Sequence, residues 1–202
     1  MKRRTLDVVF SVGGVLLAGL LLILGLVLQN QADFAKSYVK HQLTEQKIVF
    51  TPVDKLSDEE KQADCLVANA ARPLTSGKQA ECYANKYIGL HVTEVNDGKT
   101  YSETSGASRA LQAQAEAAAT TNPDDPATIA LESQAKEASG KVDTLFRGET
   151  LRGLLLTSYG FSIFGDRAQQ AALVAFAAAL VLLLASIAGF IHAFTTSKDT
   201  VI

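Results

Sequence analysis

Cys65 and Cys82 are the two cysteines of this 202-residue sequence, and their thiols are its most reactive side chains. Sixteen residues separate them, and the spacing differs from the C-x-x-C of thioredoxin-like redox motifs. A zinc site needs about four convergent ligands, and only His41 and His91 could join the two thiolates. We expect a structural disulfide, with a pair of free thiols or a metal site as the alternatives.

The three histidines offer little else for catalysis. His91 lies near Glu94 and Asp97 in the chain, which makes the only local cluster with acid–base character, although solvated surface histidines are far more common than catalytic ones. His192 follows a long apolar run and cannot join the other two. No phosphate-binding loop, G-x-S-x-G motif or dinucleotide fingerprint occurs. The sequence therefore predicts no catalytic residue, no cofactor and no metal.

Two apolar runs must position these residues. Residues 8–28 and 171–194 carry no Asp, Glu, Lys or Arg, and a helix of 20 or so such residues matches a hydrocarbon core of about 30 Å. Both runs are predicted to span a membrane. A cleavable signal peptide is the rival interpretation of the first run, but that run is long and no A-x-A site follows it, which favours a retained signal anchor.

Charges at the ends of the runs predict the orientation. Lys2, Arg3 and Arg4 precede the first run, and Lys198 follows the second. By the positive-inside rule both termini are cytoplasmic, and residues 29–170 lie outside in the plasma membrane's oxidising exterior. That segment carries 15 basic and 19 acidic residues, without the clustered basic face of a nucleic-acid binder.

The fold class is predicted to be mainly α, with two transmembrane helices enclosing an extracytoplasmic helical domain. Its expected segments are a cytoplasmic N-terminus (1–7), a transmembrane helix (8–28), the outer domain (29–150), an apolar juxtamembrane helix (151–165), a second transmembrane segment (166–194) and a cytoplasmic tail (195–202). Residues 29–46 are expected to continue the first helix beyond the membrane. The β-branched run 47–53 is treated as extended packing, because a lone strand has nothing to pair with.

Capping patterns place helices in the outer domain. Ser57 with Glu60 and Ser76 with Gln79 each have the spacing of a capping box. The helices that they begin would carry one cysteine each, so the disulfide would staple a helical hairpin. Asp97 and Gly98 mark a turn after it.

An alanine-rich stretch follows and is divided by the breaker Asn-Pro-Asp-Asp-Pro. Asp125 as N-cap and Pro126 at the first helical position suit a helix start, which predicts two antiparallel helices. Few large apolar residues lie in this arm. A solvated spacer is the first interpretation, a close-packing surface for another protein the second, and disorder the third.

The segment 151–165 is apolar but too short to cross a bilayer. Asp166 and Gln169 resemble a cap for the second span, so a separate helix at the outer membrane surface is expected. Small residues alternate with large ones there, and Gly153 with Thr157 has the small-xxx-small spacing of membrane helix contacts. This segment could pack on the chain's own core, bind a separate protein or line a lipid pocket. Its candidate partner contacts are Gly153, Thr157, Gly160, Phe161 and Phe164.

The spans repeat the small-residue spacing at Gly14 with Ala18 and at Ala185 with Gly189. Packing of the two spans on each other is the simpler interpretation, and contact with other subunits is the alternative. Neither core holds a charged residue that a proton relay, transporter or voltage sensor would use.

In segment order and local sequence, the chain resembles a group of uncharacterised actinobacterial two-span membrane proteins. The resemblance lies in the segments QADFAKSYVKHQLTEQ, DEEKQADCLVANA, QAECYANKYIGLHV and LRGLLLTSYGFSIFGDRA. Some of that group are called aromatic ring-opening dioxygenases, a chemistry that needs iron held by His and carboxylate ligands. The resemblance implies a cell-envelope location in a Gram-positive relative.

We therefore expect a non-catalytic accessory or scaffold protein that docks onto a larger membrane assembly or onto itself, with other membrane subunits and lipid as partners. The alternative is an extracytoplasmic sensor or binder of a lipid or envelope ligand. That alternative needs a pocket lined by residues such as Tyr83, Tyr87, Phe146 and Leu155.

Overall fold

The computed structural model describes residues 3–195, so the expected tail at 195–202 and the charges of Lys2 and Lys198 lie almost wholly outside the described residues. The chain divides into two compact units. The first unit combines Met1–Tyr38 with Phe161–Ile202, and the second is Val39–Gly160. Within the described residues the chain is helical throughout, apart from loops and one isolated β-bridge between Val49 and Pro73.

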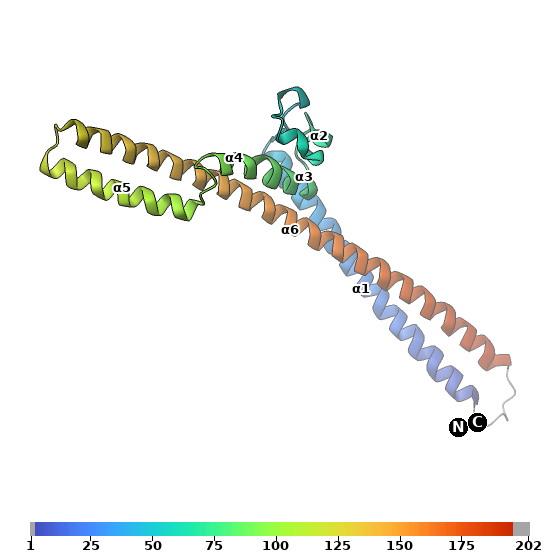
Figure 1. Ribbon diagram of the computed structural model, residues 1–202. Coiled ribbons are helices and arrows are strands. Elements are labelled where there is room, and N and C mark those ends of the chain that lie inside the picture. Colours follow the sequence, from blue (N-terminus) through green and yellow to red (C-terminus); the bar gives the residue numbers. More distant parts are fainter. Residues whose placement is uncertain (1–2, 196–202) are drawn as a thin grey trace. The chain divides into compact units, whose positions relative to one another are not determined.

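The first unit is a pair of antiparallel helices, drawn side by side in Figure 1. Helix α1 covers Arg3–Glu45 and helix α6 covers Pro126–Thr195. The expected continuation of the first apolar run as a helix over residues 29–45 is confirmed. Both helices are long and apolar enough to cross a membrane.

Helix α6 differs from the expectation for residues 151–165. It is one uninterrupted helix of 70 residues, so these residues are an internal part of it and no separate short helix exists. Asp166 and Gln169 do not cap a helix, because the backbone before them is already helical. Both side chains contact Lys36 of α1 instead. Gly153, Gly160 and Gly165 lower helix propensity by only about 1 kcal/mol each, which a helix this long tolerates.

Small residues line the contact between α1 and α6. The buried residues recur every seven positions, and we call the set the span seam: Ser11, Ala18, Gly25 and Ala32 in α1, with Gly165, Ala172, Ala179, Ser186 and Ala193 in α6. A seven-residue repeat keeps one face of a helix towards its partner, as in a coiled coil. Here the small side chains allow the two backbones to approach closely.

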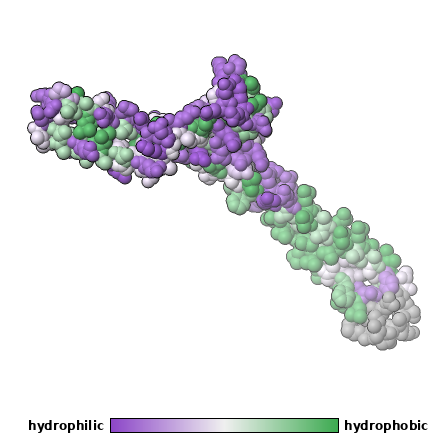
Figure 2. Space-filling view, in the orientation of Figure 1, coloured by the Kyte–Doolittle hydropathy of each residue, from purple (hydrophilic) through white to green (hydrophobic). Residues whose placement is uncertain are grey.

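Large apolar side chains cover the outside of this pair. Leu16, Leu20 and Ile23 of α1 are between 62% and 66% exposed. Many leucines and valines of α6 are exposed as well. Figure 2 shows the resulting hydrophobic band along the two helices. A soluble core helix would bury these side chains. The two helices therefore indicate a membrane protein.

The second unit contains a small module around the disulfide. Its elements are the 3-10 turns η1 (Val53–Lys55) and η2 (Glu60–Gln62), the short helices α2 (Asp64–Asn69), α3 (Gly77–Cys82) and α4 (Gly89–Glu94), and the π-helical segment η3 (Tyr83–Ile88). Its core includes Phe50, Leu66, Leu74, Ile88 and Leu155. Leu155 belongs to α6, so that helix closes the core.

The helix expected after Ser57 is only partly present. Ser57 and Glu60 do make both hydrogen bonds of a capping box, but the chain forms a single 3-10 turn and breaks at Ala63, where the backbone is extended. The residues 57–62 are all polar and give a longer helix no apolar face to bury. Helix α2 then begins at Asp64, where the apolar residues start.

The helix expected after Ser76 is confirmed, with both bonds of its capping box present. It runs through α3, η3 and α4 without a break, and the π-helical segment in its middle was not predicted. The turn at Asp97 and Gly98 is also confirmed, since both residues have positive φ angles. Gly98 adopts this conformation without the steric cost that a side chain would add.

The alanine-rich stretch forms the expected antiparallel hairpin (Figure 1). Helix α5 covers Tyr101–Thr121, and Asp125 accepts a hydrogen bond from the backbone of Ala127 at the start of α6. A second set of buried residues, mostly small ones, lies along these helices and is called the hairpin seam: Thr104, Ser108 and Ala115 in α5, with Thr128, Ala135 and the larger Leu145 in α6. Burial of these residues explains why a sequence with few large apolar residues forms an ordered hairpin.

Candidate functional site

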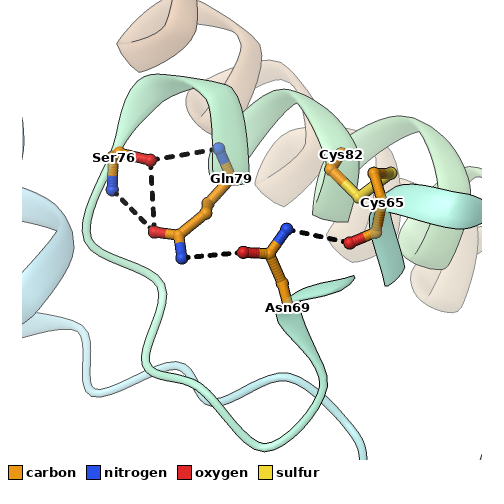
Figure 3. The surroundings of a disulfide bond; sticks show 5 residues. All are labelled: Cys65, Asn69, Ser76, Gln79 and Cys82. Atoms are coloured by element: carbon orange, nitrogen blue, oxygen red, sulfur yellow. Dashed lines mark hydrogen bonds between the residues drawn. A yellow bond between two sulfur atoms is a disulfide. The ribbon is translucent and has the colours of Figure 1, made fainter. Parts of the chain in front are cut away.

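Cys65 and Cys82 form the expected disulfide, which joins α2 to the end of α3 with an S–S distance of 2.01 Å. Figure 3 shows the polar network beside it. Gln79 donates to Asn69 Oδ1 at 3.1 Å, and Asn69 donates to the carbonyl of Cys65 at 2.8 Å. Ser76 closes the network at the start of α3. The disulfide and the network together hold α2 against α3 and indicate an oxidising, extracytoplasmic environment for this segment.

A cavity of about 650 Å³ lies beside the disulfide. Apolar atoms contribute most of its surface, although most of its lining residues have polar groups; they are Cys65, Asn69, Thr75, Ser76, Lys78, Gln79, Glu81, Cys82, Asn85 and Lys86. Several of these groups already bond to one another in the network of Figure 3. Lys78 reaches across to the ring of Tyr159, with 5.7 Å between its Nζ and the ring centre. The cavity is thus open, with a largely apolar surface and with both lysine and glutamate side chains in its lining.

The pocket expected between Tyr83, Tyr87, Phe146 and Leu155 is not present in that form. Leu155 is only 3% exposed and is packed in the core, with Tyr83 and Tyr87 against the same core. Phe146 is 54% exposed and contacts Tyr101 of α5 instead. These aromatic residues fill space rather than line a cavity.

His91 pairs with Glu60 rather than with Glu94 or Asp97. Its Nε2 lies 3.7 Å from Glu60 Oε1, and its Nδ1 lies 3.0 Å from the carbonyl oxygen of Tyr87. The Glu60 side chain is only 6% exposed. Sequence reasoning missed this pair, because the break at Ala63 and the fold of the module bring together residues that are 31 positions apart.

Aromatic rings extend this cluster along one face of the helix. Tyr83, Tyr87 and His91 follow each other at four-residue spacing, with ring centres 4.8 and 4.6 Å apart. Burial raises the pKa of the Tyr83 phenol above its ordinary value, and the neighbouring Tyr87 and Glu60 raise it further. Tyr83 therefore stays protonated at neutral pH and contributes to packing as a neutral side chain.

Arg152 of α6 lies against the π-helical segment. Its guanidinium donates to Asn85 Oδ1 at 3.4 Å and pairs with Glu149, while its Nε is buried without a hydrogen-bond partner. The same Nε lies close to Gly89, where an added β-carbon would be 3.7 Å from it, an ordinary van der Waals contact. These contacts fix α6 to the disulfide module within the second unit.

Three of the predicted partner contacts are used by the chain itself. A β-carbon at Gly14 would collide with Ser186 Oγ, and one at Gly189 would collide with Ser11 Oγ. Ala18 is completely buried in the span seam. Self-packing of the spans, the simpler expectation, accounts for these contacts, while Gly14 and Gly189 keep part of their surface exposed. Ala185 differs from them because it is exposed on the outer side of α6.

Gly153, Leu154 and Thr157 form an open surface on α6 in the second unit, which we call the docking face. Gly153 has no heavy atom within 4 Å of an added β-carbon, and neither has the nearby Gly160. Leu154 is 63% exposed. The Thr157 hydroxyl donates to the carbonyl of Gly153 on the same helix at 2.9 Å and so needs no outside partner. An uncovered glycine thus lies next to a large exposed apolar side chain.

Phe161 and Phe164 belong to the first unit. Phe161 packs edge-on against Phe34 and Tyr38 of α1, with ring centres 6.5 and 5.8 Å apart, whereas Phe164 is 74% exposed. Lys36 of α1 pairs with Asp166 at 3.2 Å. We call this group, Phe34, Lys36, Tyr38, Phe161 and Asp166, the aromatic girdle.

A second group, the terminal girdle, joins the other ends of the same helices. His192 Nδ1 lies 2.9 Å from Asp7 Oδ2, and Arg4 lies over the ring of Phe194 at 5.6 Å. Neither interhelical pair could be read from sequence spacing, since Asp7 and His192 are 185 positions apart. The signal that could have found them is the position of polar residues at both ends of two apolar runs of similar length.

Among the residues that the structure describes, no group of three or more His, Cys, Asp or Glu side chains could hold a metal ion. The described side chains that converge are thus the Glu60–His91 pair and the two girdles. Comparison with known proteins adds no assignment, since no family model, curated protein or solved structure matches this chain.

Proposed function

We propose that this chain is a non-catalytic, membrane-anchored scaffold that docks onto a larger membrane assembly, or onto a second copy of itself, through the docking face on α6. The observation that carries the proposal is the uncovered Gly153 beside the exposed Leu154. Both lie outside the two apolar runs. An exposed apolar side chain beside a glycine is the geometry that lets another helix approach closely.

The contrast with the span seam supports this proposal. In the seam, glycines at 14 and 189 are filled by serine side chains of the partner helix. At the docking face the same type of residue has no neighbour within 4 Å. A glycine in the middle of a helix destabilises it by about 1 kcal/mol relative to alanine, so open glycines at 153 and 160 have a cost that a docked partner would offset.

The membrane topology of the scaffold is part of the same proposal. Both termini are cytoplasmic and residues 29–170 are extracytoplasmic, supported by Arg3 and Arg4 at the N-terminal flank and by the disulfide in the outer segment. The resemblance to two-span actinobacterial membrane proteins agrees with a place in a Gram-positive cell envelope.

Replacement of Gly153 by Leu tests the docking face, with Gly140→Leu as the matched control. Both glycines lie in α6 and neither has a neighbour within 4 Å of an added β-carbon. Leucine has the higher helix propensity, so both variants keep the helix. The chain would be extracted from its native membrane in polymer discs through a C-terminal tag, and the co-purifying proteins sized and identified.

The proposal predicts that Gly153→Leu loses the co-purifying subunits or the second copy, while Gly140→Leu retains them. Leu154→Gln should weaken the same complex without covering Gly153. A complex of unchanged size and composition in both variants at 153 and 154 would contradict the docking face, and a bare monomer in the unaltered chain would contradict the scaffold.

The cavity beside the disulfide favours a second candidate function, the binding of an extracytoplasmic ligand. Its volume of about 650 Å³ is in the range of small-molecule sites, and its largely apolar surface with a few amide, hydroxyl and charged groups suits a small amphipathic ligand. Native mass spectrometry of the extracted chain would test this. A retained small molecule that is lost in Lys78→Ala would support it, and a chain of bare mass would count against it.

A further inference from the structure

The two apolar runs are level with each other across the span seam. Four contacts set the register: Ser11 with Gly189, Gly14 with Ser186, Gly25 with Phe176 and Ala35 with Gly165. In each contact the two residue numbers add up to 200 or 201. Residues 8–28 of α1 therefore lie opposite residues 172–192 of α6.

These level segments have the thickness of a bilayer core. Residues 8–28 and 171–191 are uncharged stretches of 21 residues, and each rises about 31 Å as a helix, close to the hydrocarbon thickness of about 30 Å. Amide side chains flank both stretches at the end that holds Leu28 and Ala171. They are Gln29, Asn30 and Gln31 in α1 and Gln169 and Gln170 in α6. Beyond these amides lies the aromatic girdle.

The two girdles have the chemistry of membrane interfaces. Aromatic rings and long cationic side chains gather where headgroups meet water. The aromatic girdle combines rings with an ion pair between the helices, and the terminal girdle combines a ring with the contact between His192 and Asp7. About 29 residues separate Asp7 from Lys36 in α1, a rise of roughly 43 Å, which matches a bilayer with its headgroup regions. The contacts between Lys36 and Asp166 and between Asp7 and His192 also oppose sliding of the two helices along each other.

We infer that the first unit binds the lipid bilayer in one fixed register, with hydrocarbon boundaries at Val8 and Ile191 on one side and at Leu28 and Ala171 on the other. The segment 151–165 then lies outside the hydrocarbon; it has many apolar residues but also contains Arg152. Moving it into the core would carry Lys36, Asp166 and Arg167 into the lipid, where charged side chains are strongly disfavoured.

Spin labels on single added cysteines measure this register. The two native cysteines are held in the disulfide, so an added cysteine is the only free thiol. Three pairs of exposed residues are level in the register and suit labelling: Phe10 with Ile191, Leu20 with Leu180, and Leu26 with Val174. The purified full-length chain would be reconstituted in vesicles of dioleoyl phosphatidylcholine and phosphatidylglycerol, and each label's accessibility to oxygen and to a nickel chelate would be compared.

The expected result is equal depth within each pair and a several-fold higher oxygen-to-nickel ratio for Leu20 and Leu180 than for the other two pairs. Labels at Leu154 and Phe164 should favour the nickel chelate, as headgroup or water positions do. Unequal depth within the pairs, or lipid-like ratios at Leu154 or Phe164, would overturn the inference. The vesicles contain no partner protein, so this result is independent of whether the docking face binds one.

Removal of the ion pair of the aromatic girdle sharpens the test. The double variant Lys36→Leu and Asp166→Leu should move a label at Phe164 towards the lipid-like ratio. It removes two of the charged side chains that would otherwise have to enter the lipid. Glu137→Leu with Lys141→Leu, which removes a pair in the hairpin, is the matched control and should leave that label unchanged. A label at Phe164 that responds equally to both double variants, or to neither, would contradict the role of the girdle.

Discussion

The span seam and the hairpin seam are built from the same kinds of residue but have opposite surroundings. Both join two antiparallel helices through alanine, serine or other small side chains. Around the span seam the outer faces carry leucine, valine and phenylalanine, whereas around the hairpin seam they carry mainly alanine, glutamine and glutamate. The contact between the helices is thus of the same kind in both seams. The residues on the outer faces differ, apolar around the span seam and largely small or polar around the hairpin seam.

This difference separates two contributions that usually occur together. Close approach of backbones gives van der Waals contact in lipid and in water alike. The hydrophobic effect adds to it only where burial removes apolar surface from water. The hairpin seam gains from both and the span seam from the first alone, so the span seam depends more strongly on the exact size of its residues.

The largest expected effect comes from a charge on the outer face. Leu16→Arg places a cation on the lipid side of α1 and should raise the free energy of membrane insertion, making it less favourable, by about 3 kcal/mol. Ala113→Arg, on the exposed face of α5, should change stability by no more than about 0.5 kcal/mol. Insertion assays for the first and thermal unfolding for the second would measure this, and similar costs at both sites would remove the distinction between the outer faces.

Overpacking the span seam should have the next largest effect. A leucine at Gly14 would meet Ser186, whereas Gly13 has no neighbour within 4 Å of an added β-carbon. We expect Gly14→Leu to destabilise the helix pair by about 1 to 3 kcal/mol and Gly13→Leu to have little effect. Unfolding in mixed micelles, followed by circular dichroism, is the measurement. Equal stability of the two variants would show that the seam tolerates larger residues.

The same change in the hairpin seam should cost less. Ala115 is 5% exposed and would be enlarged by Ala115→Leu, with the exposed Ala113→Leu as control. We expect the free energy of unfolding to fall by about 1 kcal/mol. The helices can separate slightly around the added leucine, and its burial away from water then offsets part of the cost of overpacking. Amide hydrogen exchange in α5 would measure it. A loss larger than that of Gly14→Leu would contradict the ranking of the two seams.

The smallest expected effect is an acid response confined to the start of α5. Hydrogen bonds from the backbone N–H and the hydroxyl of Thr100 hold the pKa of Glu103 below its ordinary value. The stabilisation is therefore complete above the ordinary carboxylate pKa of about 4.3 and is lost as pH falls through the lower folded-state pKa. The protection of amides at the first turn of α5 against exchange, relative to their intrinsic rates at each pH, should therefore fall in acid.

Thr100→Ala serves as the control for this response. It removes the hydroxyl partner and should return the pKa of Glu103 towards its ordinary value, with faster exchange already at neutral pH. An NMR titration of the Glu103 carboxyl would measure the shift directly. A normal pKa in the unaltered chain would mean that the capping box contributes nothing to the start of α5.

Much of the fold could be predicted from local signals. The spans follow from uncharged length, the hairpin from the breaker with Asp125 and Pro126, and α3 from the capping box at Ser76 and Gln79. The disulfide follows from two cysteines in an outer segment. Each of these signals lies within a few residues or depends on composition, so no tertiary information is needed to read it.

The rest depends on contacts between distant residues. The pairing of Asp166 with Lys36 turned an apparent helix cap into an interhelical ion pair, and the fold gave His91 a partner in Glu60 that local spacing did not suggest. The seven-residue repeat of the span seam was visible only as separate small-xxx-small pairs at Gly14 and Gly189. Whether the docking face at Gly153 and Thr157 binds a partner stays a prediction.

The span seam can form only late in synthesis, because its two helices lie near opposite ends of the chain. Helix α1 is made roughly 150 residues before the end of α6 leaves the ribosome, which at 5 to 20 residues per second is about 8 to 30 s. During that time Ser11, Gly14 and Gly25 have no partner helix and face lipid or another protein. The first span is therefore a temporary single anchor whose small-residue face is open until α6 arrives. Slowing translation within residues 126–170 should lengthen this interval without changing the final structure.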